Sequence, residues 1–172
     1  MSEPGRTRIV VVDANVLINL IHVDRLDLCG SLENIEFVVP EEVVAEVTDP
    51  DQAVKLVNAF DMGHLRREAS SDPAEIEAYA ELWRVMGKGE AACLAIAHAR
   101  GWMVASDERG RFLRHVRERL GEGRVLNTPG LLVLAIRTGL LTIEQADQLK
   151  LTLENHRFKM RFASFRDVLE EL

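Results

Sequence analysis

Short apolar runs alternate with longer stretches of helical periodicity along the chain. Three runs are continuous and rich in β-branched residues, which is typical of strands covered on both faces: "RIVVV" at 8–12, "EFVVP" at 36–40 and "GWMVAS" at 101–106. "RVLN" at 124–127 predicts a fourth strand. Strand followed by helix, repeated with short links, predicts an α/β fold with an open, mostly parallel sheet flanked by helices.

Start and stop signals give the approximate bounds of the helices. Pro40 suits the first position of a helix through "EEVVAEV", and "REASSDP" at 67–73 is expected to be a linker. Thr142 and Gln145 have capping-box spacing at the start of a late helix. Further helices are expected from about residue 15, near 51–60, near 74–85, after the glycine break at 87–89, over 110–120 and from 128.

The chain has 172 residues, which suits one domain with a helical appendix. We expect the main body over 1–140 and a C-terminal helical extension over 141–172 packed on the same domain. A hydrophobic fraction of 47% with 28% charged residues indicates a folded globular protein. The sequence shows no signal-peptide pattern, no apolar run near 18 residues and no CxxC pair, so we expect a cytoplasmic protein without a membrane span.

The net charge of −7 does not favour binding of polyanions by the molecule as a whole. Local charge differs, because seven arginines and only four acids lie between residues 98 and 124, and a second basic stretch, "HRFKMRF", covers 156–162. These segments are the expected phosphate contacts if the chain binds nucleic acid. A solvated, arginine-rich helix face explains each stretch equally well.

Four acids follow or flank the predicted strands. Asp13 ends the first strand inside a very apolar stretch, and Asp107 ends the third; Glu90 lies in the first turn of a helix, and Glu46 lies in the helix after the second strand. Because parallel strands end at the same edge of a sheet, these side chains can converge on one pocket. Taken singly, each has an ordinary explanation as a helix cap, a turn residue or a surface acid.

A cluster of ionised carboxylates is stable only when a cation neutralises it. Oxygen ligands select magnesium or manganese, and the five histidines show no metal-ligand spacing. Such a site can activate water for phosphodiester hydrolysis without a covalent nucleophile. Neither a G-x-S-x-G elbow nor a GxxxxGK[ST] loop occurs in the sequence.

Four segments carry a family resemblance. "VVDANVLINL", "VPEEVVAEV", "GKGEAACLAIAHARG" and "VASDERGR" resemble the successive acidic motifs of PIN-domain ribonucleases, in the same order, within residues 8–140. The chain is most similar to the VapC-like toxin branch or its uncharacterised prokaryotic relatives. The resemblance implies that the 1–140 body is a PIN-like nuclease domain, a three-layer sandwich with a sheet of four to five strands, followed by the C-terminal helical extension.

The resemblance also implies an Mg²⁺- or Mn²⁺-dependent endoribonuclease that cleaves single-stranded RNA as the toxin of a toxin–antitoxin pair. Its partners would be the RNA, a cognate antitoxin and a second copy in a homodimer. The implied catalytic and metal-binding residues are Asp13, Glu46, Glu90 and Asp107, with Glu108 as a further metal ligand, and with Asn15, Ser106, Arg111 and Arg114 in contact with substrate or supporting the acids. Ala14 departs from the family pattern, where Ser or Thr is frequent.

Two other classes of protein remain open. A non-catalytic PIN-like module would bind RNA or protein without cleaving it, and an incomplete acid set would favour it. A haloacid-dehalogenase-like phosphatase would have a second aspartate where this chain has Asn15, and a receiver domain would have a lysine after a late strand. Neither feature is present, so the nuclease interpretation is preferred.

Overall fold

The computed structural model describes residues 5–172; residues 1–4, the first of the predicted 1–140 body, lie outside the described part. Five strands form one parallel sheet in the order β3-β2-β1-β4-β5. From β1 the chain first builds the sheet outward through β2 and β3, and then continues on the other side of β1 with β4 and β5. Open α/β sheets bind ligands at such a reversal of strand order, here between β1 and β4. The strands are β1 (Arg8–Val12), β2 (Ile35–Pro40), β3 (Arg66–Glu68), β4 (Met103–Ala105) and β5 (Val125–Leu126).

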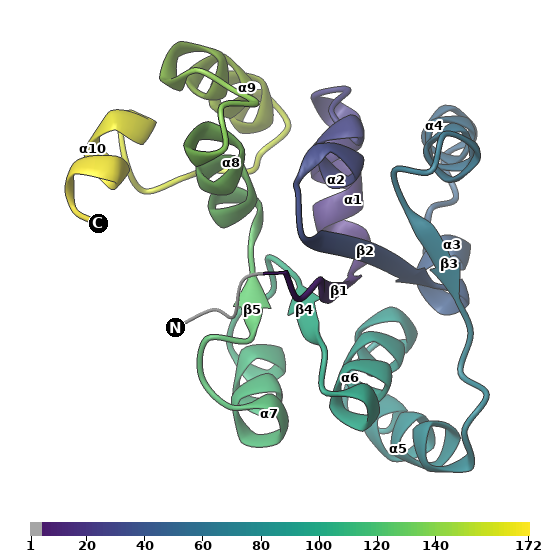
Figure 1. Ribbon diagram of the computed structural model, residues 1–172. Helices are drawn as coiled ribbons and strands as arrows, with labels where there is room; N and C mark the ends of the chain where they lie inside the picture. The colour runs from purple at the N-terminus through teal and green to yellow at the C-terminus, as the bar shows by residue number, and fades with distance from the viewer. Residues whose placement is uncertain (1–4) are drawn as a thin grey trace.

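Helices cover both faces of the sheet (Figure 1). One layer contains α5, α6 and α7, and the other contains α1, α2, α4, α8 and α9. The structure therefore confirms the predicted three-layer α/β sandwich. The helices are α1 (Ala14–His22), α2 (Asp27–Ser31), α3 (Glu41–Glu46), α4 (Pro50–Asp61), α5 (Pro73–Trp83), α6 (Lys88–Arg100), α7 (Arg111–Leu120), α8 (Thr128–Arg137), α9 (Ile143–Asn155) and α10 (Phe165–Glu170).

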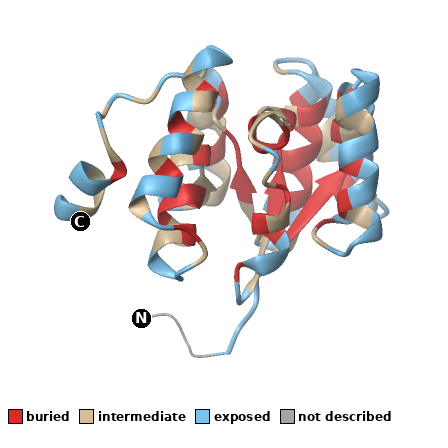
Figure 2. Cartoon of the chain, turned by 90° about the horizontal axis from the view of Figure 1, so that it is seen from above, coloured by how far each residue is buried: buried red, intermediate tan, exposed pale blue. Residues whose placement is uncertain are grey.

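The core lies between the sheet and the inward faces of the helices (Figure 2). The continuous apolar runs of β1 and β2 are buried, as expected for strands covered on both sides. Helix α6 is buried along residues 91–97 because it packs on three strands and on α5 and α7. Its small side chains permit this close packing. Cys93 in α6 and Cys29 in α2 are free thiols inside the core.

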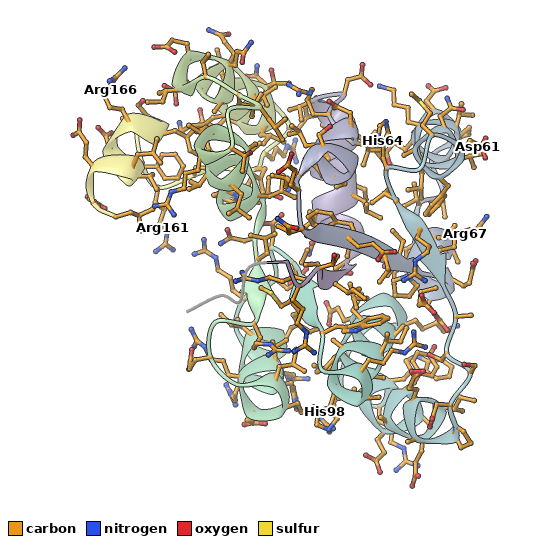
Figure 3. The ribbon with its side chains drawn as sticks, viewed as in Figure 1. Asp61, His64, Arg67, His98, Arg161 and Arg166 are labelled. Carbon is orange, nitrogen blue, oxygen red and sulfur yellow. The ribbon has the colours of Figure 1, made fainter. Side chains whose placement is uncertain are left out.

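The C-terminal helices extend one layer of the sandwich. Helix α9 begins with the predicted capping box of Thr142 and Gln145, and it packs on α1 and α8. Helix α10 is fixed to α9 through Asp147, whose carboxylate accepts hydrogen bonds from the Ser164 hydroxyl and the Phe165 N–H. Arg161 and Arg166 project from this C-terminal segment (Figure 3).

Three local predictions were wrong. The expected linker at 67–73 contains the end of β3, an edge strand whose charged side chains are paired instead of buried: Arg66 pairs with Glu36, and Arg67 with Glu41. Pro40 is the last residue of β2 and occupies the N-cap position, one residue before the first residue of α3. The short helices α2 and α10 were not predicted, because five or six residues give too little periodicity.

The longest helices, α6 and α9, have 13 residues each. A helix needs roughly 20 apolar residues to cross a bilayer. Within residues 5–172, no helix is long and apolar enough to do so.

Candidate active site

Asp13 lies at the carboxyl end of β1, next to the end of β4. Its backbone N–H donates to the Ala105 carbonyl (2.9 Å), so the two strand ends are joined. One carboxylate oxygen caps α1 by accepting from the Ala14 N–H (2.8 Å), and the other accepts from the buried Ser106 hydroxyl (3.1 Å). The side chain is only 3% exposed. Asp13 is thus both a helix cap and a buried acid at the predicted edge.

The acids around Asp13 share one electrostatic environment. Burial raises the pKa of Asp13 to about 6, and the nearby Glu90 and Glu46 also raise it, against the two hydrogen bonds. The pKa of Glu90 is raised by burial and by Glu108 and Glu46. We call Asp13, Glu46, Glu90 and Glu108 the carboxylate cluster. No ion pair within residues 5–172 involves any of the four.

Glu46 reaches this environment because residue 89 is glycine. The Gly89 N–H, in the first turn of α6, donates to Glu46 Oε1 (2.9 Å). A Cβ at position 89 would lie 2.5 Å from Glu46 Oε2 and 2.7 Å from Oε1, closer than atoms can pack. The glycine therefore leaves the space that the Glu46 carboxylate fills.

Two polar side chains among the predicted site residues, Asn15 and Ser106, hold Glu108 in its place in the carboxylate cluster. Ser106 accepts from the Glu108 N–H (3.1 Å) while it donates to Asp13. The Asn15 amide donates to Glu108 Oε1 (3.3 Å), and its oxygen accepts from the Asp107 N–H (3.1 Å). Asn15 and Ser106 therefore fix the loop after β4 against the start of α1.

Asp107 is placed differently from the other predicted acids. One of its oxygens accepts from the Thr128 N–H (2.7 Å), and the other accepts from the Thr128 hydroxyl (2.5 Å) and the Asn19 amide (2.9 Å). Burial raises the pKa of Asp107, and these hydrogen bonds oppose the rise. The carboxylate thus ties the end of β4 to α1 and α8. Both of its oxygens are engaged by Thr128 and Asn19, which distinguishes Asp107 from the four acids of the carboxylate cluster.

Comparisons with known proteins place the chain in a family. A family model with the description "DUF3368: PIN domain" matches residues 9–172.

The chain belongs to the PIN-domain family.

Among solved structures, this PIN domain is similar to a chain in the crystal structure of VapBC2 from Rickettsia felis bound to a DNA fragment from their promoter. The sequence identity is 14% and the TM-score is 0.49. The alignment covers 69% of this chain and 98% of that chain. No curated protein matches the sequence.

Two arginines of α7 in this PIN domain form no ion pair with the carboxylate cluster within residues 5–172. Arg111, expected to support the acids or bind substrate, donates to the Val85 carbonyl (3.3 Å) and so joins the start of α7 to the loop before α6. Arg114 is exposed on α7. Both remain accessible to an anionic ligand.

An aromatic rim that sequence reasoning missed borders the carboxylate cluster. Trp83, half exposed at the end of α5, stacks with Tyr79 at 6.0 Å between ring centroids. The Lys88 ammonium lies 4.7 Å from the centroid of the Trp83 ring, two residues before Glu90. Burial raises the pKa of Tyr79, as do Glu42 and Glu46. Lys88 directly precedes Gly89, whose N–H contacts the Glu46 carboxylate, so the rim adjoins the cluster. No spacing in the sequence connects residues 79, 83 and 88 with the acids. They lie together because α5 and α6 pack against each other as a helical hairpin.

The chemistry of the donor set fits a hard divalent cation. All four cluster side chains offer carboxylate oxygens, and they gather negative charge without a basic partner. Glu42 Oε2 is also buried and has no hydrogen-bond partner in the described part of the chain. As they stand, no three His, Cys, Asp or Glu side chains within residues 5–172 form a ready metal site. Binding would therefore require the carboxylates to close around the ion.

Proposed function

We propose that this PIN domain is a metal-dependent endoribonuclease that hydrolyses phosphodiester bonds of single-stranded RNA. The observation that carries the proposal is the carboxylate cluster itself. A buried Asp13 and three glutamates gather at the carboxyl edge of the sheet, where the strand order reverses, without an ion pair among residues 5–172. Asp13 is the buried member of the cluster, and a buried carboxylate without a cationic partner among the described residues is costly unless a function requires it.

The cluster would hold Mg²⁺ or Mn²⁺ through Asp13, Glu46, Glu90 and Glu108. A bound ion of this kind supplies activation of water and stabilisation of charge on the phosphate. Ser106 keeps Asp13 oriented, and Asn15 keeps Glu108 oriented, so these two ligands would be positioned before the carboxylates close around the ion. Of the acids in the loop after β4, we assign the metal to Glu108, and we assign to Asp107 the role of holding that loop on α1 and α8.

This assignment predicts opposite behaviour for two neighbouring acids. Glu108→Gln should lower Mn²⁺-dependent cleavage of a labelled single-stranded RNA by about 100-fold or more, with an unchanged melting temperature, because Glu108 is exposed. Asp107→Asn should lower the melting temperature, because its amide would meet the Thr128 and Asn19 donors. Below that temperature it should keep much of its activity. Full activity of Glu108→Gln beside a folded but inactive Asp107→Asn would reverse the assignment.

The substrate class is supported by the aromatic rim. Base–aromatic stacking contributes about 1–3 kcal/mol per base and is independent of sequence. Trp83 is half exposed, so an unpaired base can stack on its ring once the Lys88 ammonium moves from the ring to a phosphate of the RNA. Arg114 on α7 is a further expected phosphate contact.

Trp83→Ala should weaken binding of a single-stranded oligonucleotide about fivefold or more, measured by fluorescence anisotropy in EDTA so that cleavage does not interfere. Trp83→Phe should lose less, because a ring remains. Met62→Ala, which removes an apolar side chain just after α4 that is even more exposed than Trp83, is the control. If Trp83→Ala bound the oligonucleotide with the affinity of the wild type, the aromatic rim would not be part of the RNA-binding surface.

The family resemblance also supports a toxin paired with an antitoxin, an active homodimer and a cytoplasmic location. Co-expression with the product of the adjacent reading frame, followed by light scattering of the purified sample, tests the first two together. A purified protein that binds RNA but leaves it intact with Mg²⁺ and with Mn²⁺ would instead support the non-catalytic binding module.

A further inference from the structure

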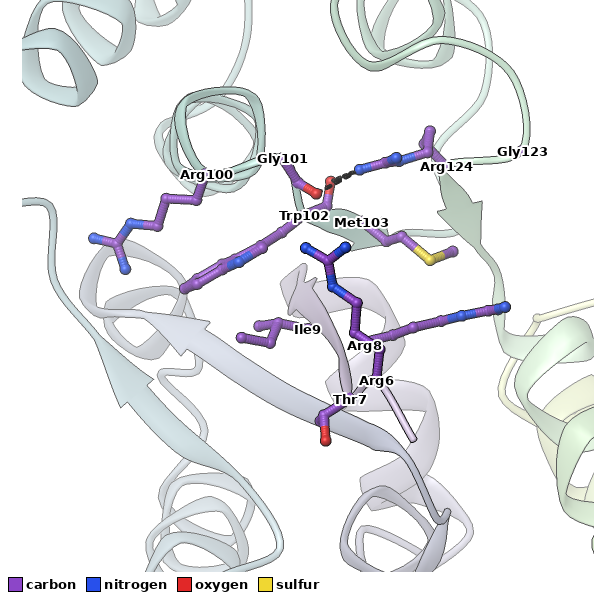
Figure 4. Close-up of a pocket in the computed structure, with 10 residues that line it drawn as sticks. All are labelled: Arg6, Thr7, Arg8, Ile9, Arg100, Gly101, Trp102, Met103, Gly123 and Arg124. Atoms are coloured by element: carbon purple, nitrogen blue, oxygen red, sulfur yellow. Dashed lines mark hydrogen bonds between the residues drawn. The ribbon is translucent and has the colours of Figure 1, made fainter. Parts of the chain in front are cut away.

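An open cavity of about 1010 Å³ lies at the edge of the sheet opposite to the carboxylate cluster. It is lined by residues at the beginnings of three neighbouring strands: Arg8 starts β1, Trp102 precedes β4 and Arg124 precedes β5 (Figure 4). Because β1 has five residues, the two edges are separated by roughly 16 Å. The cavity is therefore distinct from the proposed catalytic site.

The lining of the cavity is basic. Arg6, Arg8, Arg100 and Arg124 contribute guanidinium groups, and no Asp or Glu from the described part of the chain lines the cavity. The charge of Arg100 is compensated by Glu68 and Glu75, both at 2.8 Å. Its guanidinium lies 4.8 Å from the centroid of the Trp102 ring, so it forms a wall of the cavity.

Arg124 is the best defined of these groups. Its Nη2 donates to the Gly101 carbonyl (2.6 Å) and the Trp102 carbonyl (3.2 Å), which fixes the side chain in place. Its Nε is buried and has no hydrogen-bond acceptor among residues 5–172. No carboxylate within the same range forms an ion pair with Arg124 or Arg6. A buried donor without an acceptor is costly, so a small turn of the Arg124 side chain that brings Nε to a bound acceptor would recover a hydrogen bond.

We propose that this cavity binds the phosphate group of a nucleotide, either a free mononucleotide or a residue of an RNA strand. Phosphate matches the guanidinium fork geometry and carries more negative charge than a carboxylate. Arg6, Arg8 and Arg124 come from neighbouring segments at one edge of the sheet and surround one space, so a single phosphate can contact several of them. The proposal does not depend on nuclease activity.

The test uses binding in EDTA, where metal-dependent cleavage is absent. Trp102 lines the cavity, and Trp83→Phe leaves it as the single tryptophan of the chain, so its emission reports on the site. The probes are inorganic phosphate, adenosine 5′-monophosphate, and an octanucleotide with or without a 5′-phosphate. We expect saturable binding in the millimolar range or tighter for at least one of them, measured by Trp102 emission and by calorimetry.

The probes also separate the sources of the phosphate. Binding of adenosine 5′-monophosphate indicates a mononucleotide site, dependence on the 5′-phosphate of the octanucleotide indicates an RNA end, and indifference to it indicates the RNA backbone. Each of these outcomes supports the proposal. The absence of saturable binding by all four probes would overturn it.

Variants tie the binding to the cavity. Arg6→Gln/Arg8→Gln should lower the affinity at least tenfold, and Arg124→Lys, which keeps the charge but removes Nε, should lower it severalfold. The charge-matched control is Arg137→Gln/Arg166→Gln, two exposed arginines that lie outside the cavity and outside both basic stretches. Equal affinity of the Arg6/Arg8 variant and the control would place the phosphate elsewhere and refute the proposal.

Discussion

Asp13→Asn should abolish Mn²⁺-dependent RNA cleavage and, in the metal-free protein, raise the free energy of unfolding above pH 6. The loss of activity should exceed the 10- to 100-fold effect typical of residues that only support a metal ligand, because Asp13 is the most buried acid of the cluster. The gain in stability follows from its pKa, and both hydrogen bonds can be kept, because the Ser106 hydroxyl can accept from an amide where it now donates to the carboxylate. Few substitutions both abolish the activity of a protein and raise its free energy of unfolding. Both effects in Asp13→Asn would therefore indicate that this acid is retained for function at a cost in stability.

The sign of the stability effect follows from proton binding. An aspartate with an ordinary pKa of 3.8 in the unfolded chain has a pKa of about 6 in the folded protein, where burial disfavours its charge. The wild type therefore loses stability as the pH rises from 4 to above 6, by about 3 kcal/mol at most. The Asp13→Asn side chain carries no charge, so the advantage of the variant should appear across this window and vanish below pH 4.

Urea unfolding in EDTA at pH 4.5 and pH 8 measures this difference. Equal stability changes at the two pH values would show that the Asp13 carboxylate is well solvated in the folded protein. Cleavage by Asp13→Asn at the wild-type rate would exclude Asp13 from the metal site. The two readouts are independent of each other.

Gly89→Ala should lower cleavage by about 10- to 100-fold and leave the protein folded. The added methyl group would lie 2.5 Å from Glu46 Oε2, so the carboxylate must move away. Since that carboxylate is the end of a flexible side chain, its displacement costs little stability. Alanine is also favoured over glycine in a helix by up to about 1 kcal/mol, so the melting temperature should stay the same or rise slightly.

Gly87→Ala is the matched control for this substitution. A Cβ at position 87 meets no atom within 4 Å, and the backbone there has a φ of −66°, which alanine adopts readily. Thermal melting, Mn²⁺ binding and cleavage should be close to wild type in Gly87→Ala. An active Gly89→Ala would mean that the Glu46 position is not needed for the reaction.

Much of the fold follows from the sequence because the interior strands are continuous apolar runs. β1 and β2 are read directly from such runs, and the capping box of Thr142 and Gln145 gives the start of α9. Edge strand β3 has no such signal, because its stability comes from pairing with β2 and from ion pairs of Arg66 and Arg67. Those contacts depend on residues some 30 positions away, which a local pattern does not contain.

The candidate site was predicted in its location and less well in its detail. The positions of Asp13, Glu46 and Glu90 follow from motif order and from the common edge of parallel strands. Sequence alone does not decide between Asp107 and Glu108, since the choice depends on the Asn19 and Thr128 donors that engage Asp107. A buried Asn19 inside the apolar stretch "LINLI" was a signal that some acceptor had to reach it.

The two cysteines lie wholly inside the folded protein. Burial, with Asp27 nearby, raises the pKa of Cys29 to about 12, and burial together with Asp13 raises that of Cys93. The native molecule therefore offers no thiolate to an alkylating reagent. Labelling of Cys93 would require α6 to separate transiently from the sheet. The labelling rate under native conditions would therefore measure how often the helix that carries Glu90 opens locally.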